Sequence, residues 1–464
     1  MKVLLINPPT TNDQVPENPP LGLLYLAASI RDQHDVWVVD LDALKYDDMQ
    51  IQRRLVKEAP DIIGITATTF SYNSMRRLCE LSRKVLPRTE IVIGGPHVSS
   101  CPEKSLEETG ADHVIVGEGE LSFKKMLDDP KDENRKIIKG LRVEELSCLP
   151  LPARDLLEPD ITYYNGNIPR HVKPETVMMW SRGCPHNCLF CSNTIYMRQK
   201  TRFRPPEDII SEIKILSEFG INEIFVYDDE LVGMSENQNR WLQKVCNLII
   251  SEGLNDIFFK CQGRCSRHVD LETLAIMKKA GFKTIMWGCE SGSDKVLNVI
   301  RKGTKVLDIE HTIRTCKKSG IEAWMFLMIG NYKETLDDAE KTVRLVRKLS
   351  PDFIQVTYAT PYPSDFEKIC IEKDLIIEPD RSKWNTNVPV AKSEHMRVEE
   401  MEQIRNKLLV EGRIYQIKKA ILKELMRMEF PYKHPIMLFH QHYKNQGLTY
   451  ASKKAIEYAK RGFK

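Results

Sequence analysis

Short apolar runs alternate with amphipathic segments along the first 150 residues of the chain. The apolar runs have the length and β-branched composition of buried strands, whereas the segments between them repeat their apolar positions with the period of a helix. Strands are expected at 3–6, 36–39, 62–66, 91–93 and 114–116, and helices at 21–31, 48–58, 71–86 and 103–108. This alternation predicts an α/β fold with a doubly wound parallel sheet that helices cover on both faces.

The same alternation resumes at Thr176 and predicts a second sheet. Its strands are expected at 176–180, 223–227, 257–262, 284–288, 323–329 and 353–358. Its helices are expected at 206–218, 237–252, 270–280, 305–319 and 335–348. Strand–helix repeats of this kind are typical of an open, partial (β/α)6 barrel, whose site lies at the carboxyl ends of its strands.

The composition of the remaining segments predicts the domain organisation. Residues 126–176 are rich in charge and proline, as expected of an ordered connector. Residues 395–464 look helical and basic, with aromatic and histidine residues clustered at 430–443, and could form a cap on the barrel or a lid over its substrate. The domains are expected at 1–150, a linker at 151–175, the partial barrel at 176–375 and a C-terminal helical, basic domain at 376–464.

Loops that follow the strands of the first sheet carry candidate ligand contacts. Ligands of parallel sheets bind beyond the carboxyl ends of the strands, where glycine lets the backbone approach a flat or phosphate-bearing group. The candidates are Pro8, Pro9, Thr68, Ser71, Gly94, Gly95, His97, Gly117, Glu118 and Gly119. No Gly-x-Gly-x-x-Gly follows the first expected strand, so we do not expect a dinucleotide.

Three cysteines, Cys184, Cys188 and Cys191, lie in one short loop after the first strand expected in the second sheet. Three thiolates can hold three irons of a [4Fe–4S] cluster and leave the fourth iron open, so we interpret them as catalytic metal ligands. A zinc site would need a further ligand pair. Cys261 and Cys265 could supply one, but they lie in an apolar, strand-like stretch, and we expect them to pack in the core.

Size, charge and cysteine usage narrow the class of protein. A chain of 464 residues is expected to form several domains, and its net charge of +3 gives no global indication of nucleic-acid binding. No segment approaches the roughly 20 apolar residues of a membrane span, and we expect no leader before Pro8. Twelve scattered cysteines are typical of reduced thiols, so we expect a cytoplasmic protein.

The motifs of both halves resemble those of radical S-adenosylmethionine (SAM) enzymes that carry a cobalamin-binding domain. Cys-x-x-x-Cys-x-x-Cys is the pattern of the radical SAM superfamily, and it is present at Cys184. The other matching segments are 179–184, 227–229, 288–292, 328–335 and 358–363 in the barrel, and 7–9, 19–27, 94–97 and 116–120 in the Rossmann-like cobalamin domain. The chain departs from the family pattern at 331–333, where the usual residues around Pro-Gly are replaced. It also lacks Asp-x-His-x-x-Gly, so cobalamin is expected to bind without a protein histidine ligand.

The resemblance implies roles for residues at the strand ends of the barrel. The backbone of the aromatic residue before the third cysteine would meet adenine, and an aspartate would accept hydrogen bonds from the ammonium group of SAM. A glutamate would accept hydrogen bonds from the ribose hydroxyls, and an arginine or a serine would donate to the carboxylate. The implied SAM contacts are Phe190, Tyr227, Asp228, Asp229, Arg264, Glu290 and Ser291.

The resemblance further implies an enzyme whose cofactors are a [4Fe–4S] cluster, SAM and cobalamin. Its group contains methyltransferases and anaerobic magnesium-protoporphyrin monomethyl ester cyclases. Within that group we favour methyl transfer to an unactivated carbon of a small-molecule substrate, by way of a 5′-deoxyadenosyl radical and methylcobalamin. An electron donor such as flavodoxin or ferredoxin would reduce the cluster.

Other functions stay open at this point. The radical could serve oxidative cyclisation, dehydration or rearrangement, without methyl transfer and with a degenerate cobalamin domain. Methylthio transfer to transfer RNA fits less well, because Cys79, Cys101 and Cys148 are scattered and the tail looks helical. A cobalamin- or redox-responsive sensor would not need a SAM site. The sequence identifies neither the substrate nor the oligomeric state.

Overall fold

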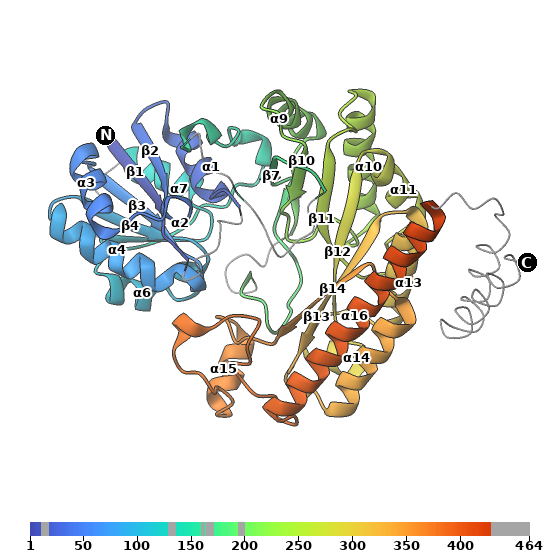
Figure 1. Ribbon diagram of the computed structural model, residues 1–464. Helices are drawn as coiled ribbons and strands as arrows, with labels where there is room; N and C mark the ends of the chain where they lie inside the picture. The colour runs from blue at the N-terminus through green and yellow to red at the C-terminus, as the bar shows by residue number, and fades with distance from the viewer. Residues whose placement is uncertain (11–17, 129–135, 159–162, 164–170, 194–199, 428–464) are drawn as a thin grey trace, which may run out of the picture.

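The computed structural model describes residues 1–10, 18–128, 136–158, 163, 171–193 and 200–427 (Figure 1). Two parallel six-stranded sheets dominate this part of the chain, one in each half of the molecule. Helices flank both sheets, and the predicted α/β fold class is confirmed. No helix in the described ranges is long and apolar enough to cross a membrane.

The first sheet has the strand order β2-β1-β3-β4-β5-β6. Its strands are β1 (Lys2–Asn7), β2 (Asp35–Asp40), β3 (Ile62–Thr66), β4 (Glu90–Gly94), β5 (His113–Val116) and β6 (Ile137–Lys139). The helical segments around it are α1 (Leu21–Ile30), α2 (Leu41–Leu44), α3 (Asp48–Glu58), η1 (Thr69–Ser71), α4 (Tyr72–Val85), α5 (Pro96–Ser100), α6 (Pro102–Thr109) and α7 (Glu120–Asp128).

Alternate side chains of β1 enter two separate cores, as the strand period requires. Leu4 and Ile6 pack with side chains of α3 and α4, whereas Val3 and Leu5 pack with α1 and α7 on the opposite face. Both faces of this sheet are therefore buried, which explains why its strands read as continuous apolar runs.

The second sheet has the strand order β14-β13-β12-β11-β10-β7. Its strands are β7 (Glu175–Met178), β10 (Glu223–Val226), β11 (Phe258–Arg264), β12 (Phe282–Glu290), β13 (Glu322–Ile329) and β14 (Phe353–Tyr358). The helical segments that follow are α9 (Pro206–Glu218), α10 (Glu236–Ser251), α11 (Leu271–Lys279), α12 (Asp294–Val299), α13 (Val306–Ser319), α14 (Leu336–Leu349), α15 (Asp365–Glu372), η4 (Arg381–Lys383) and α16 (Val398–Arg427). A short antiparallel hairpin of β8 (Ser181–Arg182) and β9 (Arg202–Phe203) lies after β7. The connector between the sheets holds η2 (Leu146–Cys148) and η3 (Arg154–Leu156).

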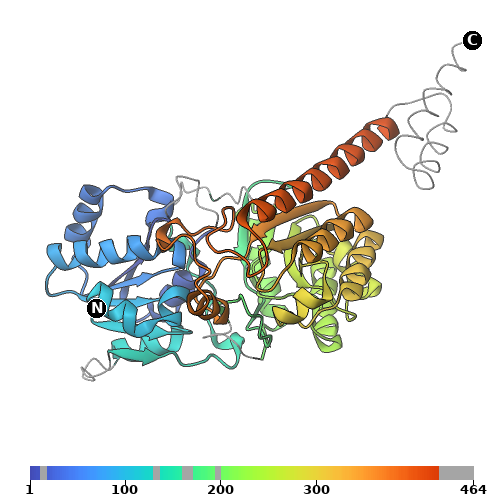
Figure 2. The same ribbon diagram turned by 90° about the horizontal axis from the view of Figure 1, so that it is seen from below.

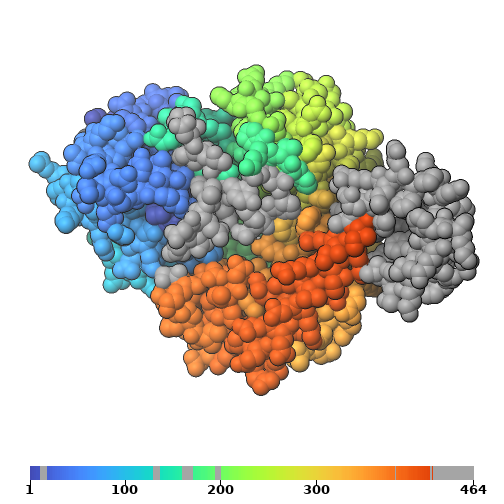
Figure 3. All heavy atoms as spheres, viewed as in Figure 1, coloured from blue at the N-terminus to red at the C-terminus, as the bar shows by residue number. Residues whose placement is uncertain are grey.

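The large helices of the second domain cover one face of the sheet, and its other face is turned toward the first domain. Leu21 and Tyr25 of α1 pack with Phe225, Met286 and Trp324 on that inner face. The segment that contains α15 and η4, orange in Figure 2, runs between the two domains. In the space-filling view, α15 and α16 form one continuous surface along the lower side of the molecule (Figure 3).

The predicted strands and long helices agree with the observed ones to within two residues at nearly every end. The elements that were not predicted include α2, α5, α7, α12, α15, β6, β8 and β9. Helix α16 lies in the predicted C-terminal helical region, whereas the aromatic and histidine cluster at 430–443 lies outside the described residues.

Candidate active site

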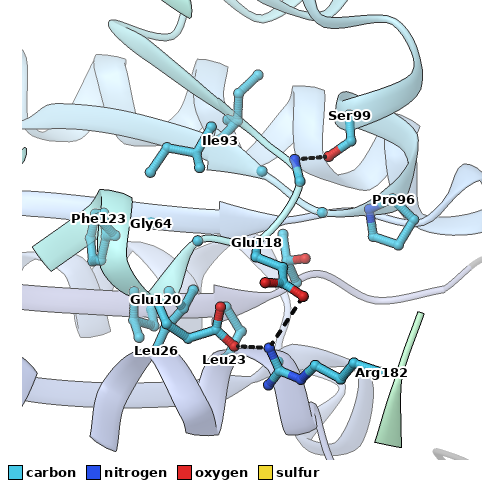
Figure 4. Close-up of a pocket in the computed structure, with 18 of the residues that line it drawn as sticks. Leu23, Leu26, Gly64, Ile93, Pro96, Ser99, Glu118, Glu120, Phe123 and Arg182 are labelled. Atoms are coloured by element: carbon cyan, nitrogen blue, oxygen red, sulfur yellow. Dashed lines mark hydrogen bonds and ion pairs between the residues drawn. The ribbon is translucent and has the colours of Figure 1, made fainter. Parts of the chain in front are cut away.

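The joint between the two domains contains a cavity of about 350 Å³ (Figure 4). Its first-domain wall is built by α1 and α7, by strands β1, β3, β4 and β5, by the start of α5, and by the loops that follow β4 and β5. The barrel contributes Met179, Ser181, Arg182, Gly183, Asn193, Tyr227 and Asp229. The carboxyl ends of both parallel sheets thus converge on one cavity, where ligands of such sheets are expected.

On the side of the first domain, the cavity is lined by apolar side chains of the sheet, α1 and α7, including Leu5 and Phe123. A Cβ added to Gly22 would meet no atom within 4 Å, so this glycine borders open space. A Cβ on Gly64 would lie 2.7 Å from Leu5 Cδ2 and would displace the wall. A slot with apolar walls and glycines at its surface fits a flat aromatic group.

Half of the contacts predicted in the first domain line this cavity. They are Gly94, Gly95, Gly117, Glu118 and Gly119. Gly95 has a φ of +94°, which glycine adopts without strain, and a side chain there would collide with Thr66. The same turn starts α5, whose Pro96 and Ser99 also line the cavity.

The other half, Pro8, Pro9, Thr68, Ser71 and His97, are not in the cavity wall. The His97 ring lies 4.0 Å from the Tyr72 ring, and its Nδ1 lies 3.0 Å from the Thr69 hydroxyl oxygen. Burial lowers the pKa of His97 to about 4. Because α5 turns this side chain toward α4, His97 packs on Tyr72 and Thr69 and does not line this cavity, and its contact with a ligand stays a prediction.

The loop with the three cysteines lies at the barrel rim beside the cavity. Its base is the β8–β9 hairpin, in which Arg182 pairs with Arg202. Backbone hydrogen bonds from Leu189 to Ile300 and from Phe366 to Leu189 fasten the loop to the barrel. Cys191 donates its amide to Cys188 at 3.2 Å, so these two residues lie on one turn.

The thiols of this loop are partly shielded from water. Burial, followed by the charge of Glu230, raises the pKa of Cys184 to about 12, and burial raises the pKa of Cys191 to about 11. These thiols therefore stay protonated at neutral pH until a metal displaces the protons. All twelve cysteines of the chain are free thiols.

A buried carboxylate that the sequence analysis missed lies beside the cysteine loop. Glu230 Oε2 lies 3.2 Å from His186 Nε2 and 3.9 Å from Cys184 Sγ. These three residues bring potential metal-ligand atoms within 4.8 Å of one another. Of these three residues, only Cys184 was predicted from the sequence as a metal ligand.

Charged side chains gather at the rim where β11 and β12 end. Lys302 Nζ donates to Glu290 Oε1 at 2.9 Å and lies 5.9 Å from the centre of the Phe190 ring. A Cβ on Gly288 would lie 2.8 Å from Lys302 Nζ, so this glycine makes room for the ammonium group. Arg264 is only 7 % exposed, yet its guanidinium group forms no hydrogen bond or ion pair with the described residues.

The chain matches two known protein families. Residues 15–127 match the B12 binding domain, and residues 178–346 match the radical SAM superfamily. An uncharacterized methyltransferase of Pyrococcus horikoshii is 33 % identical over 448 residues, which cover 92 % of this chain and 95 % of that protein. The chain belongs to the radical SAM enzymes that carry a B12-binding domain.

Two more distant proteins are also similar to this chain. An anaerobic magnesium-protoporphyrin IX monomethyl ester cyclase of Synechocystis is 27 % identical over 422 residues, covering 85 % of this chain and 82 % of that protein. The fold is shared with a radical SAM methyltransferase from Kitasatospora setae, solved with cobalamin and a [4Fe-4S] cluster, at a TM-score of 0.65 and 17 % identity. That alignment covers 86 % of this chain and 81 % of the other.

The predicted cofactors of this radical SAM enzyme, a [4Fe–4S] cluster, SAM and cobalamin, are confirmed by its two domains. The residues present fit them. Three shielded thiols on one loop suit the cluster, and the apolar slot at Gly22 and Gly64 suits the flat base of the cobalamin tail. Arg264 offers an unused cation to a carboxylate near Glu290, as SAM binding requires.

Two predicted SAM contacts, Asp228 and Ser291, are buried and do not line the cavity. Both oxygens of Asp228 are occupied, because they accept hydrogen bonds from the Trp180 amide at 2.8 Å and the Ser181 hydroxyl at 2.6 Å. Ser291 is fully buried, and its hydroxyl accepts a hydrogen bond from the Ser293 amide. These hydrogen bonds hold the ends of β7 and β12 in place, and the contact of either residue with SAM stays a prediction.

The neighbouring predicted contacts do reach the rim. Asp229 lines the cavity and accepts a hydrogen bond from Asn193 Nδ2 at 2.6 Å. Tyr227 also lines the cavity and is 49 % exposed, so its ring is accessible to a ligand. Strand geometry explains the difference, because consecutive side chains at the end of β10 point to opposite sides.

Proposed function

We propose that this radical SAM enzyme transfers a methyl group from SAM to an unactivated carbon of a small molecule. The observation that supports this most directly is the shared cavity, whose walls combine the glycine loops of the B12-binding domain with the rim beside the cysteine loop. When bound there, cobalamin would supply the methyl group, and the cluster would supply the electron that cleaves a second SAM. The residues of the chain bind, orient and shield these partners.

Arg264 would bind the carboxylate of SAM. It is buried and has no partner among the described side chains, so a carboxylate would complete its hydrogen bonding. A charge-assisted interaction of this kind fixes the methionine end of SAM relative to the cysteine loop, and thereby orients the bond that breaks.

Glu290 would accept hydrogen bonds from the ribose hydroxyls. Its backbone has a φ of +60°, which is uncommon for residues other than glycine, and the ion pair with Lys302 holds the carboxylate in place. Only Oε1 is engaged by Lys302, so the second oxygen is available to a hydroxyl.

Several contacts enclose the joint and would keep water from a reactive radical. Helix α1 packs on the inner face of the barrel through Leu21 and Tyr25. On another side, the Phe70 ring lies 5.5 Å from the Tyr362 ring, which joins the loop after β3 to the segment before α15.

The supply of electrons is also part of this proposal. A flavodoxin- or ferredoxin-type donor would reduce the cluster, and the protein would work in the cytoplasm. Twelve free thiols, most of them buried in the core, suit a reducing compartment.

The test is an anaerobic assay with the cluster- and cobalamin-loaded protein, a chemical reductant, SAM carrying a deuterated methyl group, and a deproteinised extract of the source cells. Methyl transfer predicts both S-adenosylhomocysteine and 5′-deoxyadenosine, together with a deuterated small molecule in the mass spectrum. If 5′-deoxyadenosine forms without S-adenosylhomocysteine, methyl transfer is wrong. That outcome would favour the oxidative or cyclising chemistry suggested by the cyclase relative.

A further inference from the structure

Two buried ion pairs join the cavity loop of the first domain to the hairpin that carries the cysteine loop. Arg202 Nη2 lies 2.5 Å from Glu118 Oε1, and Arg202 Nη1 donates to Glu118 Oε2 at 2.9 Å. Arg182 Nη1 lies 2.7 Å from Glu120 Oε1 (Figure 4). The four side chains are between 5 and 8 % exposed. We refer to them as the domain clamp.

Each end of the domain clamp is part of a cofactor region. Glu118 and Glu120 flank Gly119, and all three residues line the cavity. Arg182 and Arg202 face each other across the β8–β9 hairpin, and Arg182 lies two positions before Cys184. A shift at either end would therefore change the distance between the cavity and the cysteine loop.

The Glu118 carboxylate is committed to the clamp. Besides Arg202, the Val143 amide donates to Glu118 Oε2 at 2.8 Å, and Arg202 also donates to the Val143 carbonyl. Burial would raise the pKa of Glu118, but the hydrogen bonds from Arg202 and the Val143 amide outweigh it and hold the pKa below its usual value. Glu118 is ionised and fully used, so it lines the cavity without being free to bind a ligand.

The second pair extends the clamp to a third element. Arg182 lies over the Tyr25 ring of α1, 4.9 Å from its centre, and lies 4.0 Å from Glu118 as well as close to Glu120. The clamp thus links α1, the loop before α7 and the hairpin. Buried pairs of this kind lose much of their Coulomb energy to desolvation, and their clearest use is to fix one arrangement of the parts they join.

We propose that Glu118 and Glu120 are positioning residues that, through Arg202 and Arg182, hold the cysteine hairpin at a fixed place over the cobalamin cavity. The proposal rests on the proposed function, in which the distance between these two regions matters. Apolar packing of α1 on the barrel also joins the domains, but the clamp is the charged link between the cavity loop and the hairpin. The clamp makes cavity and hairpin one rigid unit.

The test uses the full-length protein with its cluster and with hydroxocobalamin as the probe. The variants are Glu118→Gln, Arg202→Met and the double variant. Three quantities are measured: the Kd for hydroxocobalamin, the relaxation enhancement of cob(II)alamin by the reduced cluster in pulsed EPR, and hydrogen exchange of β8 and β9. Lys260→Met is the matched control, because Lys260 is a buried cation paired with Glu175 and Glu223 near the amino ends of the barrel strands, away from the clamp.

Glu118→Gln leaves the charge of Arg202 unpaired, and Arg202→Met leaves Glu118 with only Arg182 at 4.0 Å. Each single variant should weaken hydroxocobalamin binding about tenfold, as expected for residues coupled in one ion-pair network. It should also reduce the relaxation enhancement and speed exchange in the hairpin. The double variant leaves neither charge unpaired and should recover thermal stability, while the relaxation enhancement stays low. The Lys260→Met control should lose stability and keep the wild-type Kd and relaxation.

Wild-type relaxation and hairpin exchange in the double variant would overturn the proposal, because Glu118 and Arg202 would then contribute only stability. If the wild-type protein bound no cobalamin, hairpin exchange alone would decide, and unchanged exchange in the single variants would refute the clamp. Failure of the proposed function is recognised separately. In that case the wild-type protein forms no S-adenosylhomocysteine, while the variants still show the changes in Kd, relaxation enhancement and hydrogen exchange.

Discussion

The two domains present the same edge of a parallel sheet to the joint, but the chemistry at that edge differs. In the first domain the wall consists of glycines and apolar side chains, and its two carboxylates are neutralised by arginines from the barrel. At the barrel rim the charges are still available: Arg264 has no described partner, and Glu290 keeps one oxygen free.

This contrast matches the two ligands. Cobalamin is large and flat, so shape and close backbone approach can select it, whereas SAM is small and charged and needs matched charges. The same fold principle therefore gives a site that recognises shape beside one that recognises charge. The comparison can be tested by changing one region and measuring the ligand of the other.

The largest expected effect is the loss of the cluster. Cys188→Ala should abolish SAM cleavage, with a decrease of more than about 1,000-fold in 5′-deoxyadenosine formation, because two thiolates cannot hold a cubane. Cobalamin binding should stay close to wild type, since its slot belongs to the first domain. Iron content, 5′-deoxyadenosine assays and hydroxocobalamin titration measure these effects. Cys265→Ala, which removes a core thiol outside the loop, should keep the cluster.

Arg264→Met should have the next largest effect. Loss of one charge-assisted hydrogen-bonding partner is expected to raise the Kd for SAM by about 10- to 100-fold. Cobalamin binding and cluster content should not change, which separates the charge-selective site from the shape-selective one. Arg264→Lys keeps the positive charge and should recover part of the affinity. An unchanged Kd for SAM in Arg264→Met would contradict the assignment.

The sequence predicted the secondary structure well where a run of residues shares one periodicity. Helix α3 was predicted at both ends from the period of its apolar positions, and a capping box of Asp47 and Gln50 fixes its start. Helix α5 and strand β6 were missed because elements of 5 and 3 residues are too short to show a period. Helix α7 was missed because the Gly-Glu motif before it looked like a ligand loop.

The candidate site was predictable as far as local motifs extend. The cysteine spacing and the glycine loops carry their function in a few adjacent residues. The pairing of Glu118 with Arg202 joins positions 84 residues apart, and Lys302 is a single lysine with no local signal, so neither could be seen without the fold. Whether Asp228 or Asp229 reaches the rim depends on the side to which each side chain points after β10, and the sequence does not show this.

Filling the apolar slot should give a smaller effect that is confined to cobalamin. Gly22→Leu adds a side chain where a Cβ meets open space, so the fold should tolerate it while the slot is blocked. We expect cobalamin binding to weaken by about 1–3 kcal/mol, the usual cost of overpacking. The matched variant Gly22→Ala is small enough to leave binding nearly unchanged. Equal effects of both variants, or weaker SAM binding in Gly22→Leu, would contradict the separation of the two sites.

The smallest expected effect concerns stability, and its sign should differ between the domains. Burial raises the pKa of Asp228 to about 7, from an ordinary value of 3.8, and lowers that of His97 to about 4, from 6.5. The raised pKa of Asp228 favours the folded barrel below pH 3.8, and this stabilisation is lost as the pH rises toward 7. The lowered pKa of His97 favours the folded first domain above pH 6.5, and this stabilisation is lost as the pH falls toward 4.

Denaturant unfolding at pH 5 and pH 8 can separate these two contributions. Relative to wild type, Asp228→Asn should gain stability on going to pH 8, and His97→Phe should gain it on going to pH 5, each by at most about 1.4 kcal/mol per pH unit. Phenylalanine retains the ring packing on Tyr72, so the change isolates the titrating group. Because Asp228 holds the end of β7 and His97 packs between α4 and α5, the two variants should leave the Kd for cobalamin unchanged. If the stability of both variants relative to wild type changed in the same direction between pH 5 and pH 8, these groups would not control the pH dependence of stability in their domains.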